Sequence, residues 1–223
     1  MIIQIYAFTD IDQAVEAAEM GVDLIGFIAG DYGLVSGELS FAEAHRLAQA
    51  LPPHTVRVAL TMAVQVDEIL RMVEAVGPDI VHISTDLEDV GVDAMRRLRG
   101  ELPASVRLMK AIHVDGEESI AAARRFAPVS DLLLLDTKVG GMPGIGATGQ
   151  LHDWSISRRI VESVPVPVIL AGGLSPENVA DAMLAVQPWG VDSNTHTNIY
   201  GSPVEKDMQR IRDFVAAVRS SHA

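Results

Sequence analysis

The sequence predicts an α/β protein that folds as a single (β/α)8 TIM barrel over residues 1–223. Short apolar runs alternate with segments of helical periodicity along the whole chain. The runs are almost continuously apolar, which is typical of parallel strands in a sheet covered by helices. Eight such units within 223 residues favour a closed barrel. A doubly wound open sheet is the structural alternative.

Each predicted strand is a short run of aliphatic residues. In chain order, the eight runs are residues 2–8, 23–28, 56–61, 80–84, 106–113, 132–135, 166–170 and 189–192. The segments between them carry apolar residues at helical spacing, such as Ala14, Val15 and Ala18. Asp10 and Ser40 are predicted N-caps of two of these helices.

Glycines mark the predicted ends of several helices. Gly21, Gly77 and Gly100 each follow a periodic segment, as a C-terminal glycine does. The last helix is predicted over residues 204–218.

Composition narrows the possible functions. Hydrophobic residues make up 48% of the chain, enough for a sizeable core, and the formal charge is −13. Such a field disfavours nucleic acid and acidic membranes as partners, although backbone N–H groups can still hold a small phosphate. The absence of cysteine excludes disulfides, thiolate metal sites and cysteine nucleophiles. With no signal-type segment and no run of ~20 apolar residues, we expect a cytoplasmic protein.

A glycine pair follows the seventh predicted strand. Gly172 and Gly173 precede a helix that is predicted to begin at Pro176 and Glu177. Glycines let backbone N–H groups approach an anion, and a helix N-terminus favours negative charge. In these barrels the loops after strands seven and eight frequently form the phosphate site. The alternative is a plain tight turn. The predicted phosphate-binding residues are Gly172, Gly173, Leu174, Asn194 and Thr195.

A second glycine-rich stretch, residues 140–149, follows the sixth predicted strand. Its length and glycine content favour a mobile active-site loop over a loose surface loop. Thr148 and Gly149 are therefore predicted to contact the substrate.

Polar side chains at the predicted strand ends are candidates for the chemistry. Asp136 directly follows four leucines, and an apolar floor would raise its pKa toward that of a useful acid. His82 shares a strand face with Ser84, and a polar contact or proton transfer is predicted for it. Further candidate substrate contacts are Lys110, His113 and His196. No metal site and no cofactor are expected.

The ordered motifs of the chain resemble the phosphoribosylanthranilate isomerase family of tryptophan biosynthesis over essentially the whole length. The motifs are Asp136-Thr137-Lys138, Gly146-Ala147-Thr148-Gly149 with Asp153-Trp154, and Leu170-Ala171-Gly172-Gly173-Leu174-Ser175-Pro176-Glu177-Asn178-Val179. The resemblance implies a barrel that catalyses an Amadori rearrangement of a phosphoribosylamine. It also implies that Asp136 is the general acid that opens the furanose ring, and that the backbone around Gly172 and Gly173 binds the phosphate.

Two departures from the family pattern concern the base and the aromatic acid. Tyr6 stands where the family has its cysteine base. Lowering a phenol pKa from ~10 to ~7 requires about 4 kcal/mol of differential stabilisation. The loop after the second predicted strand lacks the arginine that binds the anthranilate carboxylate in the family, and Glu38 lies at or beside that position. A carboxylate ligand is expected to meet like charge there.

The leading hypothesis is therefore an aldose–ketose isomerase of this kind, with an altered phosphorylated substrate that lacks such a carboxylate. Asp136, Tyr6 and His82 are its predicted catalytic residues. Genuine phosphoribosylanthranilate isomerase activity with a substituted base is the runner-up. A non-catalytic phosphometabolite-binding barrel, or a lyase that uses Lys110 as a Schiff base, stays open. The protein is expected to be a monomer or a homodimer.

Overall fold

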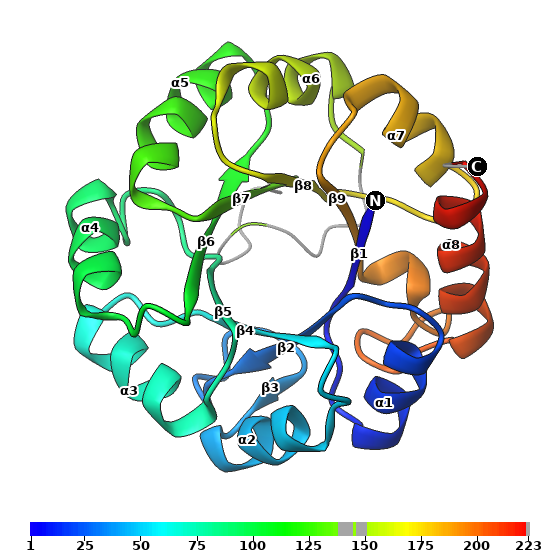
Figure 1. Cartoon of the computed structure of the whole chain (residues 1–223), viewed down its shortest axis with the longest axis horizontal. Helices are drawn as coiled ribbons and strands as arrows, with labels where there is room; N and C mark the ends of the chain where they lie inside the picture. Colours follow the sequence, from blue (N-terminus) through cyan, green and yellow to red (C-terminus); the bar gives the residue numbers. More distant parts are fainter. Residues whose placement is uncertain (138–144, 146–150, 222–223) are drawn as a thin grey trace.

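The computed structural model describes residues 1–137, residue 145 and residues 151–221. Its strands form a closed ring, and the helices surround that ring on the outside (Figure 1). The strands are β1 (Ile2–Ile5), β2 (Leu24–Ala29), β3 (Glu38–Leu39), β4 (Val56–Thr61), β5 (Ile80–Ile83), β6 (Arg107–His113), β7 (Leu132–Asp136), β8 (Val168–Leu170) and β9 (Gly190–Ser193). The helices are α1 (Ile11–Glu19), α2 (Phe41–Ala50), α3 (Val66–Val76), α4 (Val92–Glu101), α5 (Glu117–Phe126), α6 (Trp154–Ser163), α7 (Val179–Val186) and α8 (Met208–Ser220), with 3-10 turns η1 (Ala127–Val129) and η2 (Thr195–Thr197).

The sheet closes on itself and confirms the predicted (β/α)8 barrel. The hydrogen-bonded order is β1-β9-β8-β7-β6-β5-β4-β2, and a β1–β2 pairing completes the ring. All of these pairings are parallel. The short β3 was not predicted. It extends the edge of β2, where Ile28 pairs with Glu38 and Ala29 with Leu39.

Alternation along each strand divides the core into two parts. One set of side chains fills the barrel interior, and the intervening set packs outward against the helices. The interior set includes Leu24, Val58, Ile80, Met109, Leu132, Leu134 and Ile169. Neighbours such as Ile25, Val81 and Leu133 belong to the outer cluster. The interior side chains form the floor of the site described below.

Helix boundaries follow the predicted caps in part. The Asp10 side chain accepts a hydrogen bond from the Gln13 N–H, and Ser40 and Glu43 form a reciprocal capping box. Gly77 ends α3 in the left-handed conformation, with φ 69°. Gly100 does not end a helix, because α4 continues to Glu101. Leu102 precedes a proline and is extended, which is what ends that helix.

Two other predicted helix starts lie too early in the chain. After the glycine pair, the Asn178 side chain accepts a hydrogen bond from the Ser175 N–H, so residues 176–178 form a turn and α7 begins at Val179. The final helix begins at Met208 and not at residue 204, because Asp207 is its N-cap. Among the described residues, no helix is long and apolar enough to cross a membrane.

Candidate active site

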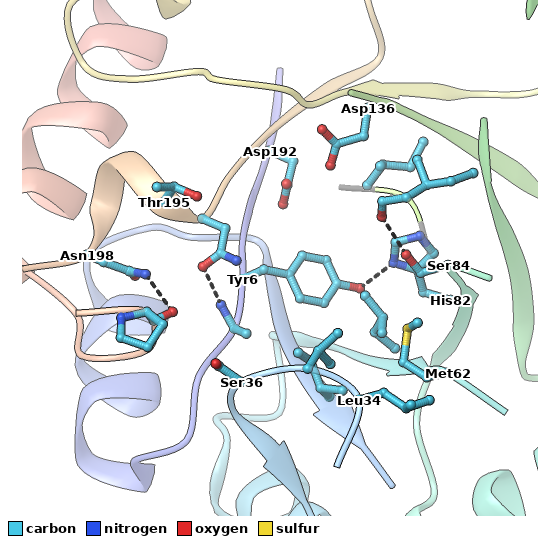
Figure 2. A pocket seen from close by; sticks show the side chains of 18 of the residues that line it. Tyr6, Leu34, Ser36, Met62, His82, Ser84, Asp136, Asp192, Thr195 and Asn198 are labelled. Carbon is cyan, nitrogen blue, oxygen red and sulfur yellow. Dashed lines mark hydrogen bonds between the residues drawn. The ribbon is translucent and has the colours of Figure 1, made fainter. Parts of the chain in front are cut away.

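A cavity of about 410 Å³ opens at the carboxyl ends of the strands. Its wall combines residues of the ends of β1, β5, β7 and β9 with residues of the loops after β2 and β9 (Figure 2). The titratable side chains in this wall are Tyr6, His82, Asp136 and Asp192. The volume falls within the range of small-molecule sites, so we treat this cavity as the candidate active site.

Asp136 is the last residue of β7, two residues after the interior residue Leu134 and therefore on the same face of the strand. Its side chain is buried, and burial raises the pKa of its carboxyl group to about 7, although the Thr137 N–H donates to Oδ1 at 2.7 Å and opposes the rise. A carboxyl group with a pKa near neutrality can both donate and accept a proton. The structure therefore gives Asp136 the apolar floor that was predicted for it.

Tyr6 and His82 face each other across the barrel mouth, with 2.9 Å between the phenol oxygen and Nδ1 (Figure 2). The Tyr6 ring lies directly over Gly26, where an added Cβ would stand 2.4 Å from ring carbons. Burial raises the pKa of Tyr6 well above its usual value, and the charge of Asp192 adds to the rise. Burial and the charge of Lys110 lower the pKa of His82 to about 3. Both side chains are therefore neutral at pH 7, and Tyr6 is poorly suited to be a base.

Asp192 was not predicted as a site residue. It lies on the interior face of β9, opposite Gln4 of β1, whose Nε2 donates to Asp192 Oδ1 at 3.1 Å. Burial raises the pKa of Asp192 to about 8 and the charge of Asp136 adds to the rise, whereas Gln4 and Lys206 oppose it. A carboxylate within an otherwise apolar strand was the sequence signal for this residue.

Lys206 was also missed, because it lies in a loop far along the chain from its partners. Its buried ammonium group donates to the Tyr6 carbonyl oxygen and to the side-chain oxygens of Asn194 and Asn198. Burial lowers the pKa of Lys206 to about 7, and Asp192 opposes the fall. These bonds fasten the end of β1 to the exit of β9, so Lys206 holds the cavity wall in place.

The glycine pair after β8, Gly172 and Gly173, is the predicted phosphate-binding turn, called the phosphate grip below. Gly172 and Gly173 have φ values of 84° and 67°, a region that favours glycine. An added Cβ on Gly172 would lie 2.7 Å from Thr137 Oγ1 and 2.8 Å from His152 Nδ1. Within the described part of the chain, the N–H groups of Gly172, Gly173 and Thr195 donate no hydrogen bond.

Of the other predicted phosphate contacts, Leu174 can act only through its backbone. The Leu174 side chain is buried, and its carbonyl oxygen accepts from Ser193 Oγ at 2.7 Å. The Asn194 side-chain oxygen already accepts from the Ala7 N–H and from Lys206. The donors for an anion are thus main-chain N–H groups, together with the amide N–H groups of Asn194 and the hydroxyl group of Thr195, two residues that line the cavity.

His152, which was not predicted as a site residue, lies beside this turn. Its Nδ1 lies 3.1 Å from Thr137 Oγ1, and its Nε2 lies 2.7 Å from Ser157 Oγ. Burial lowers the pKa of His152 to about 4. The neutral ring packs beside Gly172 and limits the shape of the turn.

The loop after β2 differs from the sequence-based expectation. Glu38 does not present its charge to the cavity, because its carboxylate accepts four backbone N–H groups of residues 32–35, at 2.6 to 3.1 Å. This arrangement fixes the loop with Leu34, Val35 and Ser36 in the cavity wall. The expected repulsion by Glu38 is therefore wrong, and the wall on this side is mainly apolar.

Several predicted substrate contacts do not reach the cavity. Lys110 points outward from β6, where its ammonium group donates to the Thr85 carbonyl oxygen at 2.6 Å and lies over the Phe126 ring. Strand phase explains the error, because the interior position of β6 is the preceding residue, Met109. This placement also removes the support for a Lys110 Schiff base.

The remaining predicted contacts are not in the described cavity wall. His113 is partly exposed at the end of β6, 3.7 Å from Asp115, and His196 lies in η2 beyond the wall. Thr148 and Gly149 lie outside the described residues, as does most of the glycine-rich stretch 140–149. Among the residues that the structure describes, no group of three or more His, Cys, Asp or Glu side chains could hold a metal ion.

Comparisons with known proteins agree with this geometry. A family model described as N-(5'-phosphoribosyl)anthranilate (PRA) isomerase matches residues 3–217. N-(5'-phosphoribosyl)anthranilate isomerase 2 of Methanosarcina mazei is 35% identical over 215 residues, which cover 96% of this chain and 92% of that protein. The solved PRA isomerase of Thermotoga maritima superposes with a TM-score of 0.80 at 26% identity, covering 99% of this chain and 100% of that one. A PRA isomerase in complex with reduced 1-(o-carboxyphenylamino)-1-deoxyribulose 5-phosphate has the same fold, with a TM-score of 0.78 at 24% identity and coverage of 99% and 100%.

Proposed function

The chain belongs to the N-(5'-phosphoribosyl)anthranilate isomerase family, and from this premise we propose that it isomerises a phosphorylated N-substituted ribosylamine by acid–base catalysis. The product is the corresponding 1-amino-1-deoxyribulose 5-phosphate. The observation that carries the proposal is the buried Asp136 carboxyl group, which has a pKa of about 7 and lies at the mouth of the barrel. A proton donor of this kind is what opening the furanose ring requires.

The glycine pair supports the phosphate end of this substrate. Main-chain N–H groups of Gly172, Gly173 and Thr195 come from the loops after β8 and β9, the usual place of a phosphate in this fold. A dianion held by backbone dipoles needs no lysine or arginine nearby. Thr195 lines the described cavity wall, whereas Gly172 and Gly173 do not, so the phosphate is proposed to bind at the edge of the cavity beside Thr195.

The wall opposite the carboxyl groups supports a neutral N-substituent. Ile28, Leu34, Val35, Leu60 and Met62 line this side, and no lysine or arginine belongs to the described cavity wall. A carboxylate bound there would lose its hydration without gaining a cationic partner, which is costly. We therefore propose an uncharged, apolar N-substituent in place of anthranilate.

A matched pair of substrates tests the proposal. Ribose 5-phosphate condenses with aniline or with anthranilate, and the two products differ by one carboxylate. We expect the protein to convert the aniline compound with at least a tenfold higher kcat/KM, which corresponds to about 1.4 kcal/mol of transition-state discrimination. Formation of the ketose is followed by chromatography, and for anthranilate also by loss of fluorescence. Asp136→Asn should abolish both activities.

The controls separate the competing functions. Asp181→Asn makes the same chemical change on the exposed surface of α7 and should leave turnover unchanged. Preferred turnover of the anthranilate compound would identify a genuine PRA isomerase of tryptophan biosynthesis with a different carboxylate contact. No turnover of either compound, with inorganic phosphate still raising the melting temperature, would identify a non-catalytic phosphometabolite-binding barrel.

The proposal treats residues 1–223 as one domain that acts in the cytoplasm as a monomer or homodimer. The family match over residues 3–217 and the eight units from β1 to α8 support the single domain. Sedimentation velocity of the purified chain distinguishes the two assemblies, and a larger assembly would contradict both.

A further inference from the structure

The proposed isomerisation needs a second proton-transfer group besides Asp136. Ring opening takes a proton from an acid, and the following step removes the hydrogen of substrate carbon C2. Tyr6 and His82 are occupied with each other at 2.9 Å, and both are neutral. Of the titratable groups in the described cavity wall, Asp192 is the one that is left.

The geometry of Asp192 suits a base. Its Oδ1 accepts from Gln4, and Oδ2 makes no hydrogen bond with any described residue although it belongs to a cavity-lining side chain. Asp136 has the same arrangement, with Oδ1 bonded to the Thr137 N–H. Figure 2 shows the two carboxyl groups near each other on one side of the Tyr6 ring. Each carboxyl group thus keeps one oxygen for the substrate.

Three groups from different elements shift the pKa of Asp192. Asp136 of β7 raises its pKa, whereas Gln4 of β1 and Lys206, in the loop before α8, lower it. Tyr6 of the β1 end faces it as a neutral phenol. With pKa values of about 7 and 8, the two carboxyl groups together hold one proton near neutral pH. Because the pKa of Asp192 is the higher of the two, the placement with the proton on Asp136 is the less populated one, and it is the placement that ring opening uses.

We propose that Asp192 is the catalytic base that takes the C2 proton, while Asp136 is the acid. This inference rests on the proposed function. Asp136 donates its proton to the ring oxygen, and the C1–O bond breaks as the nitrogen lone pair forms C1=N. Asp192 then accepts the C2 proton; the C2–H electron pair forms C1=C2, and the C1=N pair returns to nitrogen.

Ketonisation completes the cycle and restores both side chains. The proton on Asp192 passes to C1, and the proton of the C2 hydroxyl passes to Asp136 as the C2=O bond forms. The net change is an isomerisation, with no oxidant, reductant or co-reactant. Two carboxyl groups that share one proton can therefore replace a dedicated base at the end of β1.

Asp192→Asn tests the proposal, with the aniline and anthranilate compounds as substrates. Asparagine keeps the acceptor for Gln4 Nε2 but cannot take a proton. We expect kcat to fall by ~10²–10⁴-fold, whereas KM and the rise in melting temperature caused by inorganic phosphate stay close to those of the wild type. With ribose deuterated at C2, the isotope effect on the residual kcat should be larger in Asp192→Asn than in Asp136→Asn. A purely structural role of Asp192 would leave this isotope effect unchanged.

Gln4→Met tests the same proposal without changing Asp192, in case the asparagine variant fails to fold. Loss of the Gln4 donor raises the pKa of Asp192, so the acidic limb of the kcat profile should move to higher pH. An unchanged profile, or an Asp192→Asn variant that keeps wild-type kcat, would overturn the assignment of Asp192 while leaving the proposed function intact. Inactivity of the wild type on both compounds would overturn the proposed function and this inference with it.

Discussion

Tyr6 illustrates how one side chain can change the chemistry of a barrel mouth. Its ring fills the space above Gly26, and its phenol is bonded to His82. Because burial and Asp192 both disfavour the phenolate, Tyr6 is not suited to act as a base. It fills part of the cavity mouth and makes a hydrogen bond with His82. The groups in the cavity that are suited to transfer protons are instead the carboxyl groups of Asp136 and Asp192.

Tyr6→Phe should therefore keep most of the catalytic rate. We expect kcat to change by less than about tenfold, well below the ~10²–10⁴-fold loss expected for a general base. The free energy of unfolding should fall by about 1–3 kcal/mol, because His82 Nδ1 loses its partner in a buried site. Steady-state kinetics and urea denaturation measure the two effects. A loss of kcat as large as that of Asp136→Asn would make Tyr6 a catalytic residue.

Asp136 should make the stability of the protein depend on pH. Its pKa is raised in the folded state from 3.8 to about 7, so folding favours the protonated carboxyl group. This contribution is fully present below about pH 4 and is lost as the pH rises through 7. The full shift corresponds to about 4 kcal/mol.

Asp136→Asn removes this ionisation and also relieves the repulsion on Asp192. The unfolding free energy of the variant, relative to the wild type, should therefore increase between pH 5 and pH 8. Urea denaturation at each pH measures this difference, with the exposed Asp181→Asn variant as the control. A difference that does not vary with pH would show that Asp136 is not protonated in the folded protein.

At the scale of elements, two loops shape the ends of the cavity by different means. Glu38 gathers four N–H groups of its own loop and thereby holds Leu34 and Val35 in the apolar wall. In the turn after β8, the N–H groups of Gly172 and Gly173 donate no hydrogen bond to any residue that the structure describes, and His152 and Thr137 confine Gly172 from outside. One loop uses its backbone donors within itself, whereas the other keeps those of Gly172 and Gly173 for the proposed phosphate ligand.

Gly172→Ala should disrupt the phosphate grip. The added Cβ meets Thr137 Oγ1 and His152 Nδ1 at under 3.0 Å, so the turn must shift. We expect inorganic phosphate to raise the melting temperature much less than in the wild type, and KM for the phosphorylated substrate to increase at least tenfold. Gly77→Ala is the matched control, because Gly77 also has a positive φ but nothing lies within 4 Å of its Cβ position. Equal effects of both variants on KM would place the phosphate elsewhere.

Over the whole molecule, the sequence predicts the barrel, because periodicity is a local property. The same pattern put Asp136 at a strand end and His82 within a strand, and both line the described cavity. Lys110 was misplaced because a shift of one residue turns a side chain to the opposite face. Asp192 and Lys206 were missed for another reason: their hydrogen-bond partners Gln4 and Tyr6 lie 188 and 200 residues away in the chain.

The net charge of the whole molecule also bears on how substrate reaches the cavity. The formal charge is −13, and the proposed substrate carries a phosphate dianion. Repulsion between them extends over about 30 Å at 10 mM ionic strength but only about 8 Å at 150 mM. Backbone N–H groups attract the phosphate only at short range, so long-range repulsion should dominate the approach.

Added salt should therefore raise kcat/KM of the wild-type protein. We expect an increase of several-fold between ~10 and ~150 mM KCl at low substrate concentration. At saturating substrate, kcat should stay constant, because the buried carboxyl groups are shielded from the solvent ions. The series repeated with potassium acetate controls for specific binding of chloride. A fall of kcat/KM with salt would mean that the local field of the phosphate grip outweighs the net charge, or that chloride competes for the site.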